Sequence, residues 1–269
     1  MNHTNNISVI YKEQIWNRRN LKKSVSDWLA DEMPVALVYN GVAHTVIMVL
    51  PKDLKNLAIG FSLSEGIIEI PQDIYDIEIL FHDNGIEIRI EISSRRFLIL
   101  QNRRRTMIGR TSCGICGIEK LEHFNQRLKP LSFNVTFNLE NLDLALDEIK
   151  IFQPIGILSG CTHIAAWILL DGSILSAFED VGRHVAIDKL LGYRSQQSKL
   201  LWQQGAILIS SRASYEIVQK SIICGVEILF TISAATRMAV KLAKQYNLTL
   251  VGFNKIGFST IYTHPNRLI

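Results

Sequence analysis

The chain has 269 residues, of which 48% are hydrophobic and 20% are charged, and its formal net charge is +4. This balance is typical of a globular protein with a well-buried core and excludes a chain that stays disordered for lack of apolar residues. The charge is too small to indicate nucleic-acid binding by itself, and no run of about 18 apolar residues predicts a membrane helix.

Four cysteines, at positions 113, 116, 161 and 224, are too few for a disulfide framework and favour a reducing compartment. The pair Arg18-Arg19 is similar to a twin-arginine export signal, but the residues that follow at 24–32 are polar. We therefore interpret the pair as solvated surface and expect a cytoplasmic protein.

The N-terminal part predicts a small α+β domain over residues 31–112, preceded by a poorly ordered arm at 1–30, which is polar and aperiodic. Apolar residues at positions 54, 57, 58 and 61 recur on one helical face and predict a helix over 51–63. Strands are predicted at residues 35–39, 45–50, 74–80 and 86–92, with Asn40-Gly41 as a hairpin signal between the first two.

The most informative motif is Cys113-Gly-Ile-Cys116, in a loop and linker assigned to residues 113–135. Two thiols at this spacing can share a metal, close a disulfide or pass sulfur between them. Gly114 and Gly117 permit turn conformations that bring the two sulfurs together. One alternative is a zinc site in which Cys161 and His163 complete the ligand set.

Arginines surround this motif. The stretch from Arg95 to Ser112 holds no acidic residue, and it contains six arginines, at positions 95, 96, 103, 104, 105 and 110. A positive field favours thiolate over thiol, so we expect lowered cysteine pKa values and attraction of anions.

The C-terminal part, residues 136–269, predicts an α/β domain. A helix is expected around Leu142–Ile149, then strands at 164–170 and 174–178, joined by Asp171-Gly172, then a helix at 184–191 capped by Gly192. Strands at 206–210, 228–233 and 248–253 then alternate with helices at 214–224 and 236–246. This alternation predicts an open three-layer sandwich around a parallel sheet.

Ligands of such sheets bind beyond the carboxyl ends of the strands, and these ends are polar here. Arg212 and Lys255 could hold phosphate, and Phe253 and Phe258 could stack on a planar base. Ordinary surface loops with capping serines are the alternative interpretation.

A dense polar cluster spans residues 179–184 and contains Glu179, Asp180, Arg183 and His184. These groups could bind or orient a polar ligand, or they could form a helix N-cap at Asp180 with a local ion pair. Cys224, near the apolar stripe of its helix, is predicted to belong to the core.

Several motifs together resemble those of the formate dehydrogenase accessory sulfurtransferase family, FdhD. They cover nearly the whole chain from about residue 30, and they lie at residues 34–40, 60–66, 110–117, 160–166, 179–184, 188–190, 210–216 and 262–265. The resemblance implies a sulfurtransferase that accepts sulfur from a cysteine desulfurase as a persulfide. It then delivers the sulfur to the molybdenum or tungsten bis(guanine dinucleotide) cofactor for formate dehydrogenase.

The resemblance also implies a C-terminal domain similar to the cytidine-deaminase fold, a homodimer, and no structural metal, membrane or nucleic-acid partner. Cys113 matches the persulfide-carrying cysteine and Cys116 its partner. The segment Phe253, Asn254, Lys255, Ile256, Gly257 and Phe258 matches the part that binds the guanine-nucleotide end of the cofactor, to which we add Arg212 and His184. Phe258 replaces an expected basic residue, and Cys161 stands where many relatives have glycine.

Two other functions stay open from the residues alone. A chaperone could carry the cofactor while the cysteine pair holds zinc or forms a disulfide. Nucleic-acid binding through the arginine stretch is a weaker alternative, since Phe97 is the one aromatic residue among its basic residues.

Overall fold

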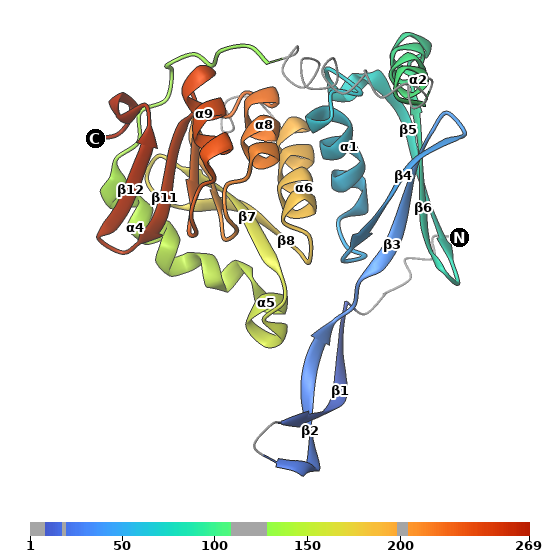
Figure 1. Ribbon diagram of the computed structural model, residues 1–269, viewed down its shortest axis with the longest axis horizontal. Coiled ribbons are helices and arrows are strands. Elements are labelled where there is room, and N and C mark those ends of the chain that lie inside the picture. The colour runs from blue at the N-terminus through green and yellow to red at the C-terminus, as the bar shows by residue number, and fades with distance from the viewer. Residues whose placement is uncertain (1–8, 18–19, 109–127, 198–203) are drawn as a thin grey trace.

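The computed structural model describes residues 9–17, 20–108, 128–197 and 204–269. Its described strands form three sheets (Figure 1): β1-β2, β4-β3-β6-β5 and β12-β11-β10-β9-β7-β8. No helix in these ranges is long and apolar enough to cross a membrane.

The described part of residues 1–30 corrects the expectation of a poorly ordered arm. Strands β1 (Ile10–Asn17) and β2 (Asn20–Ala30) form an antiparallel hairpin of their own. The sequence signal was weak because polar residues such as Lys12, Glu13 and Gln14 interrupt the apolar alternation.

The four-stranded sheet confirms all the strands predicted for the N-terminal domain. It contains β3 (Met33–Tyr39), β4 (Val42–Val49), β5 (Ile74–His82) and β6 (Gly85–Ile92), with a short 3-10 helix η1 (Pro71–Asp73) before β5. Helix α1 (Leu54–Ser64) follows β4 as predicted, and its Leu57 shares a buried cluster with Ile88 and Ile90 of the sheet. Helix α2 (Ser94–Ile108) was missed, because its many arginines hide an apolar stripe.

The six-stranded sheet carries the C-terminal domain. Its strands are β7 (His163–Leu169), β8 (Ile174–Asp180), β9 (Gly205–Ile209), β10 (Ile228–Thr231), β11 (Thr249–Lys255) and β12 (Phe258–Thr263). Strands β9, β10 and β11 are parallel as predicted, whereas β7 pairs antiparallel with both β8 and β9. Strand β12, which the sequence analysis did not identify, adds an antiparallel edge.

Helices cover both faces of this sheet, which gives the three layers expected (Figure 1). One face holds α4 (Leu139–Glu148), followed by η2 (Ile149–Phe152) and the unpredicted α5 (Pro154–Ser159). The other holds α6 (Arg183–Ser195), α8 (Tyr215–Ile223) and α9 (Arg237–Gln245), and a last turn η3 (Pro265–Arg267) closes the chain.

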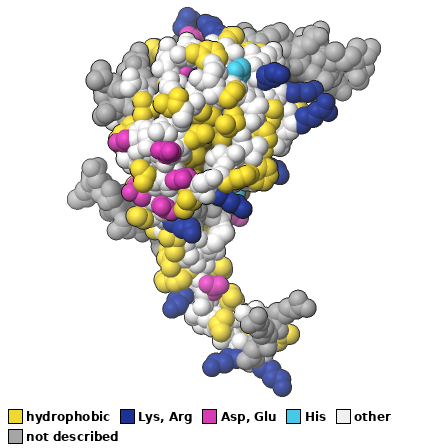
Figure 2. Space-filling model, turned by 90° about the vertical axis from the view of Figure 1, so that its left-hand side faces the viewer, with side chains coloured by type: hydrophobic (Ala, Val, Ile, Leu, Met, Phe, Trp, Pro, Cys, Tyr) yellow, Lys and Arg dark blue, Asp and Glu magenta, His cyan; other side chains and the backbone are white. Residues whose placement is uncertain are grey.

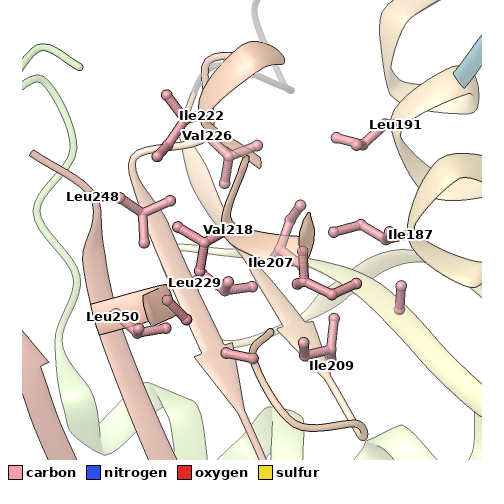
Figure 3. Packing of buried hydrophobic residues seen from close by; sticks show 14 of the residues in the cluster. Ile187, Leu191, Ile207, Ile209, Val218, Ile222, Val226, Leu229, Leu248 and Leu250 are labelled. Atoms are coloured by element: carbon pink, nitrogen blue, oxygen red, sulfur yellow. The ribbon is translucent and has the colours of Figure 1, made fainter. Parts of the chain in front are cut away.

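The sheet is buried on both faces, because alternate residues of each strand enter different clusters. Ile207 and Ile209 of β9 pack with α6 and α8, whereas Leu208 faces the α4 side. Figure 3 shows Ile187 and Leu191 of α6 directed toward the strand residues. Burial of about 25 cal/mol for each Å² of apolar surface makes such a two-sided sheet the main source of stability.

Helices α1 and α6 join the two domains through glycine contacts. The predicted cap at Gly192 is wrong, since α6 continues through it to Ser195. A Cβ atom at Gly192 would lie 1.9 Å from the carbonyl oxygen of Asn56, and one at Gly60 would lie 1.7 Å from that of Asp188. Both glycines therefore permit a close helix–helix approach rather than a helix end.

Candidate functional site

Four strands of the larger sheet end on the same edge. Strands β8, β9, β10 and β11 run in one direction, and β7 begins where they end. We call this the carboxyl edge and define it by residues 160–163, 179–184, 210–214, 232–236 and 253–258. It gathers the three polar strand ends that the sequence predicted as a ligand site.

Hydrogen bonds join the neighbouring loops of the carboxyl edge. The Ser210 N–H donates to the Ile164 carbonyl oxygen at 3.1 Å, and the Ser210 hydroxyl oxygen accepts from the Ile164 N–H at 3.0 Å. Ala213 and Ala235 form a parallel bridge beyond the ends of β9 and β10. The Phe253 N–H reaches the Ser233 carbonyl oxygen at 2.9 Å, so the loops are held as one continuous surface.

One end of this edge holds two histidines and an arginine. His184 lies in the first turn of α6, and its Nε2 lies 3.4 Å from the Glu216 carboxylate on α8. The Arg183 Nε is buried and has no hydrogen-bond partner within the described structure. Burial, and then the Arg183 charge, lower the pKa of both His163 and His184. At this end of the edge, the Arg183 guanidinium therefore lies near two histidines, His163 and His184, whose neutral forms are favoured.

Glu179 and Asp180 are scaffolding in this structure. Glu179 accepts hydrogen bonds from the N–H groups of Ile155 at 3.1 Å and Gly156 at 2.8 Å, at the start of α5. Asp180 lies 2.6 Å from Lys189, and both side chains are fully buried. The predicted N-cap at Asp180 is wrong, because Gly182 occupies that position. Asp180 forms an ion pair, but its cation is Lys189, one helical segment away, and not a residue of the cluster 179–184.

The other end of the edge is the β11–β12 turn. Phe253 has a left-handed backbone with φ of 51°, which is strained for a bulky residue, and strain of this kind is concentrated at functional sites as well as in turns. Phe253 and Phe258 are 45% and 60% exposed, and Lys255 is exposed beside them. Two aromatic faces and a cation are thus available to a planar, anionic ligand.

The remaining residues of the turn differ in their surroundings. The Asn254 side chain is buried and donates to the carbonyl oxygens of Thr231 at 2.9 Å and Val251 at 3.1 Å, so it shapes the turn. Ile256 is exposed, and the Gly257 N–H donates to the Asp143 carboxylate at 3.1 Å. Arg212 is exposed in the loop after β9.

The predicted cofactor contacts lie on one edge but not in one cluster. His184 follows β8, and the turn at 253–258 follows β11, four strands away. At about 4.8 Å for each strand, the two ends are separated by ~19 Å. Arg212, after the intervening strand β9, lies between them. The arrangement suits an elongated ligand better than a compact one.

The cysteines fall into two groups. Cys113 and Cys116 lie outside the described residues. Cys161 is exposed on the carboxyl edge, with its thiol 3.2 Å from the Ser159 hydroxyl. Cys224 packs against the core as predicted, and burial raises the pKa of its thiol to about 12, which keeps it protonated. Within the described ranges, no group of three metal-ligating side chains is present.

One of the six arginines does not contribute a free charge. Arg96 is buried and pairs with Asp73 at 3.1 Å and with Glu69. The expectation that the arginine stretch carries unpaired positive charge is therefore wrong at Arg96, because acidic residues distant in sequence fold against it.

The sequence analysis also missed Glu216 as the partner of His184. The two residues are 32 positions apart, and no local spacing links them.

We expect the free energy of unfolding to fall as the pH drops below about 6.5, the ordinary pKa of histidine. Because the pKa values of His163 and His184 are lowered in the folded protein, the unfolded chain binds more protons in that range. Urea unfolding at pH 7.5, 6.5 and 5.5 would measure the slope. The double variant His163→Gln/His184→Gln should reduce it, and an unchanged slope would contradict the assignment.

The comparisons with known proteins agree with the sequence-based resemblance. A crystal structure of a protein assigned as a formate dehydrogenase accessory protein from Desulfotalea psychrophila matches with a TM-score of 0.72 and 21% identity, covering 97% of this chain and 99% of that one. At this identity, the match shows a shared fold. Residues 30–269 match the model of the FdhD/NarQ family, so the chain belongs to the FdhD/NarQ family.

Proposed function

We propose that this protein is a sulfurtransferase that supports the maturation of formate dehydrogenase. The observation that carries the proposal is the family match over residues 30–269, which includes the Cys113-x-x-Cys116 motif. The formate dehydrogenase accessory protein that shares the fold supports the same assignment. The similarity to the cytidine-deaminase fold and a homodimeric state are parts of this proposal.

In the proposed reaction, the Cys113 thiolate attacks the terminal sulfur of a cysteine desulfurase persulfide. A sulfur–sulfur bond forms on Cys113, the donor's sulfur–sulfur bond breaks, and the donor leaves as a thiolate. The Cys116 thiolate then attacks the Cys113 sulfur, so that a disulfide forms and the terminal sulfur leaves as hydrosulfide. The two thiols are oxidised while the sulfur is reduced by two electrons, and two external thiols must then reduce the disulfide, leaving as a disulfide of their own.

The acceptor in this proposal is the molybdenum or tungsten bis(guanine dinucleotide) cofactor, bound as a substrate along the carboxyl edge. The exposed rings of Phe253 and Phe258 suit stacking on its guanine, and Lys255 and Arg212 suit its phosphates. The separation of ~19 Å between this turn and His184 fits a long dinucleotide ligand.

Sulfur loading tests the proposal. After incubation with a cysteine desulfurase and cysteine, the peptide spanning residues 111–120 should gain the mass of one sulfur atom. Cys113→Ala should abolish this gain, and a formate dehydrogenase that depends on the variant should have only background activity, because no other thiol can form the persulfide at that position. Mass spectrometry and an activity assay measure the two effects.

Cys224→Ala is the matched control, because it removes a cysteine that is buried and protonated, and it should load sulfur normally. Normal loading and activity of Cys113→Ala would reject the proposal. Stoichiometric zinc in the purified protein that is lost in Cys113→Ala and Cys116→Ala would instead favour a zinc-bound carrier of the cofactor.

A further inference from the structure

Strand β12 forms the outer edge of the larger sheet. It pairs with β11 on one side, and no described strand pairs with its other side, which we call the open side of β12. Its six residues, Phe258–Thr263, include no charged side chain and no proline. Proteins usually protect an edge strand with charges, prolines or bulges, because unpaired backbone groups bind other strands. Register shifts interrupt the pairing with β11, but no charge within the strand blocks its open side.

Apolar side chains are exposed along this strand. Ile256 is 62% exposed just before it, and Ile261 is 40% exposed within it. Ile261 is paired with Val251, which belongs to the buried cluster on the α4 side of the sheet. Tyr262 packs against the cluster on the α9 side. A strand added to the open side would alternate in the same way, and it would present one row of side chains toward each helix.

Helix α4 flanks one side of β12 and is acidic. The Asp143 carboxylate accepts a hydrogen bond from the Gly257 N–H at 3.1 Å, in the turn that precedes β12. Glu140 lies three residues before Asp143 and Asp147 four residues after it, so the three carboxylates lie on the same side of α4. Glu140 and Asp147 are exposed.

Helix α9 flanks the other side of β12 and is basic. Its exposed cations are Arg237, Lys241 and Lys244, whose spacing places them on one side of the helix. The Lys244 carbonyl oxygen lies 3.1 Å from Nε2 of His264, the residue that follows β12. Figure 2 views this part of the molecule and shows hydrophobic side chains with acidic ones toward one flank and basic ones toward the other.

We propose that the open side of β12 binds an extended segment of a partner protein as an added strand. The segment carries basic side chains on the face toward α4 and acidic side chains on the face toward α9. Backbone hydrogen bonds to β12 supply affinity, and the two charged flanks select the pattern of the segment. This inference does not depend on the sulfur-transfer chemistry.

A second copy of the chain is a poor occupant of this site. Two copies that paired their β12 strands antiparallel would be related by a twofold axis perpendicular to the joined sheet. Helix α4 would then lie on the same face as its equivalent, and so would α9. Like charges would meet on both faces, acidic on one and basic on the other, and like charges placed opposite each other are destabilising.

Binding of synthetic peptides to the full chain tests the charge pattern. The first peptide is about eight residues long, a usual strand length, with lysine and isoleucine alternating on one face and glutamate and threonine on the other. The control peptide has the same composition, with both charges mixed on each face. Fluorescence anisotropy should show that the first peptide binds about tenfold more tightly, because only its charges match both flanks.

Charge reversal of one flank should change this preference. In Glu140→Lys/Asp147→Lys both flanks are basic, so the first peptide should lose its advantage, and a peptide with glutamate on both faces should bind more tightly than it does. Adding Lys241→Glu/Lys244→Glu exchanges the two flanks. The preference for the first peptide should then return, because a strand that binds in the opposite direction turns its faces over.

The control variant Asp76→Lys/Glu91→Lys makes the same change in net charge on exposed positions of the smaller sheet, and it should bind both peptides as the wild type does. Hydrogen exchange of residues 258–263 should slow when the first peptide binds. A photoreactive group at the centre of the peptide should cross-link to the same residues.

Four results would overturn the proposal: no binding of the first peptide, equal binding of the two peptides, a preference that neither charge reversal changes, or protection and cross-links outside residues 258–263. Self-association of the wild-type chain that itself protects these residues would also overturn it, because a second copy would then be the occupant. A chain that binds the first peptide as expected but fails to load sulfur would reject the proposed function alone.

Discussion

Gly60→Ala is expected to destabilise the protein by about 3 kcal/mol or more, although alanine is ordinarily the better helix former by about 0.5–1 kcal/mol. The new Cβ atom would lie 1.7 Å from the Asp188 carbonyl oxygen and 2.6 Å from its carbonyl carbon. These are backbone atoms of α6 and cannot rotate away, so the two helices must separate. Thermal denaturation should show a melting temperature lower by about 6–12 °C.

Gly160→Ala is the matched control for this prediction. Gly160 has φ of 70°, and a Cβ atom there would meet nothing within 4 Å. Its replacement therefore costs backbone strain alone, about 1–2 kcal/mol. A Gly60→Ala variant that is as stable as Gly160→Ala, or more stable than wild type, would show that α1 and α6 can move apart at little cost.

The glycine at position 192 explains why helix ends were hard to predict from this sequence. A glycine after an apolar run is the usual sign of a helix C-terminus, and Gly225, which follows the end of α8 with φ of 71°, fits this rule. At Gly192 the glycine instead lets α6 pack closely against the backbone of Asn56 in the other domain. Local sequence does not distinguish the two uses, because the second depends on a partner more than 130 residues away.

The strands were predictable for a different reason. Runs such as residues 206–209 and 228–230 are continuously apolar, and a strand buried on both faces requires that composition. Strand β12 was missed because it is an edge strand with polar residues such as Ser259 and Thr260, which resemble a loop. Helix α5 has six residues, too few to show a helical period.

The candidate site was predictable in position but not in the roles of its residues. The polar strand ends gave the carboxyl edge correctly, because parallel strands must end together. Asn254 was expected among the cofactor contacts, yet the structure buries its side chain in hydrogen bonds to Thr231 and Val251. Such a distinction depends on tertiary hydrogen bonds, which residue type and spacing do not show.

Removal of the Lys189 ammonium, in Lys189→Met, is expected to cost about 3–5 kcal/mol near neutral pH. Lys189 and Asp180 are fully buried 2.6 Å apart. Asp180 also accepts a hydrogen bond from the Leu50 N–H at 3.1 Å, and Lys189 donates one to the Leu50 carbonyl oxygen at 3.2 Å. The variant leaves a buried carboxylate with no cation. As a control, Arg89→Met removes an exposed partner of Glu87, whose charge water and salt already screen, and should leave the free energy of unfolding almost unchanged.

The pH dependence of this loss separates the unpaired charge from a simple packing defect. Burial already raises the pKa of Asp180 above its ordinary value, and the Lys189 charge opposes that rise. Without Lys189 the pKa rises further, so the folded variant takes up a proton that the unfolded chain does not hold above about pH 4. The stability lost relative to wild type should therefore shrink as the pH falls from about 7 to 5 in urea unfolding.

In Asp180→Asn/Lys189→Met, where no carboxylate is left, the difference from wild type should lack this recovery. A loss in Lys189→Met that stays constant over the same range would show that the ammonium acts through its packing rather than by compensating the buried carboxylate.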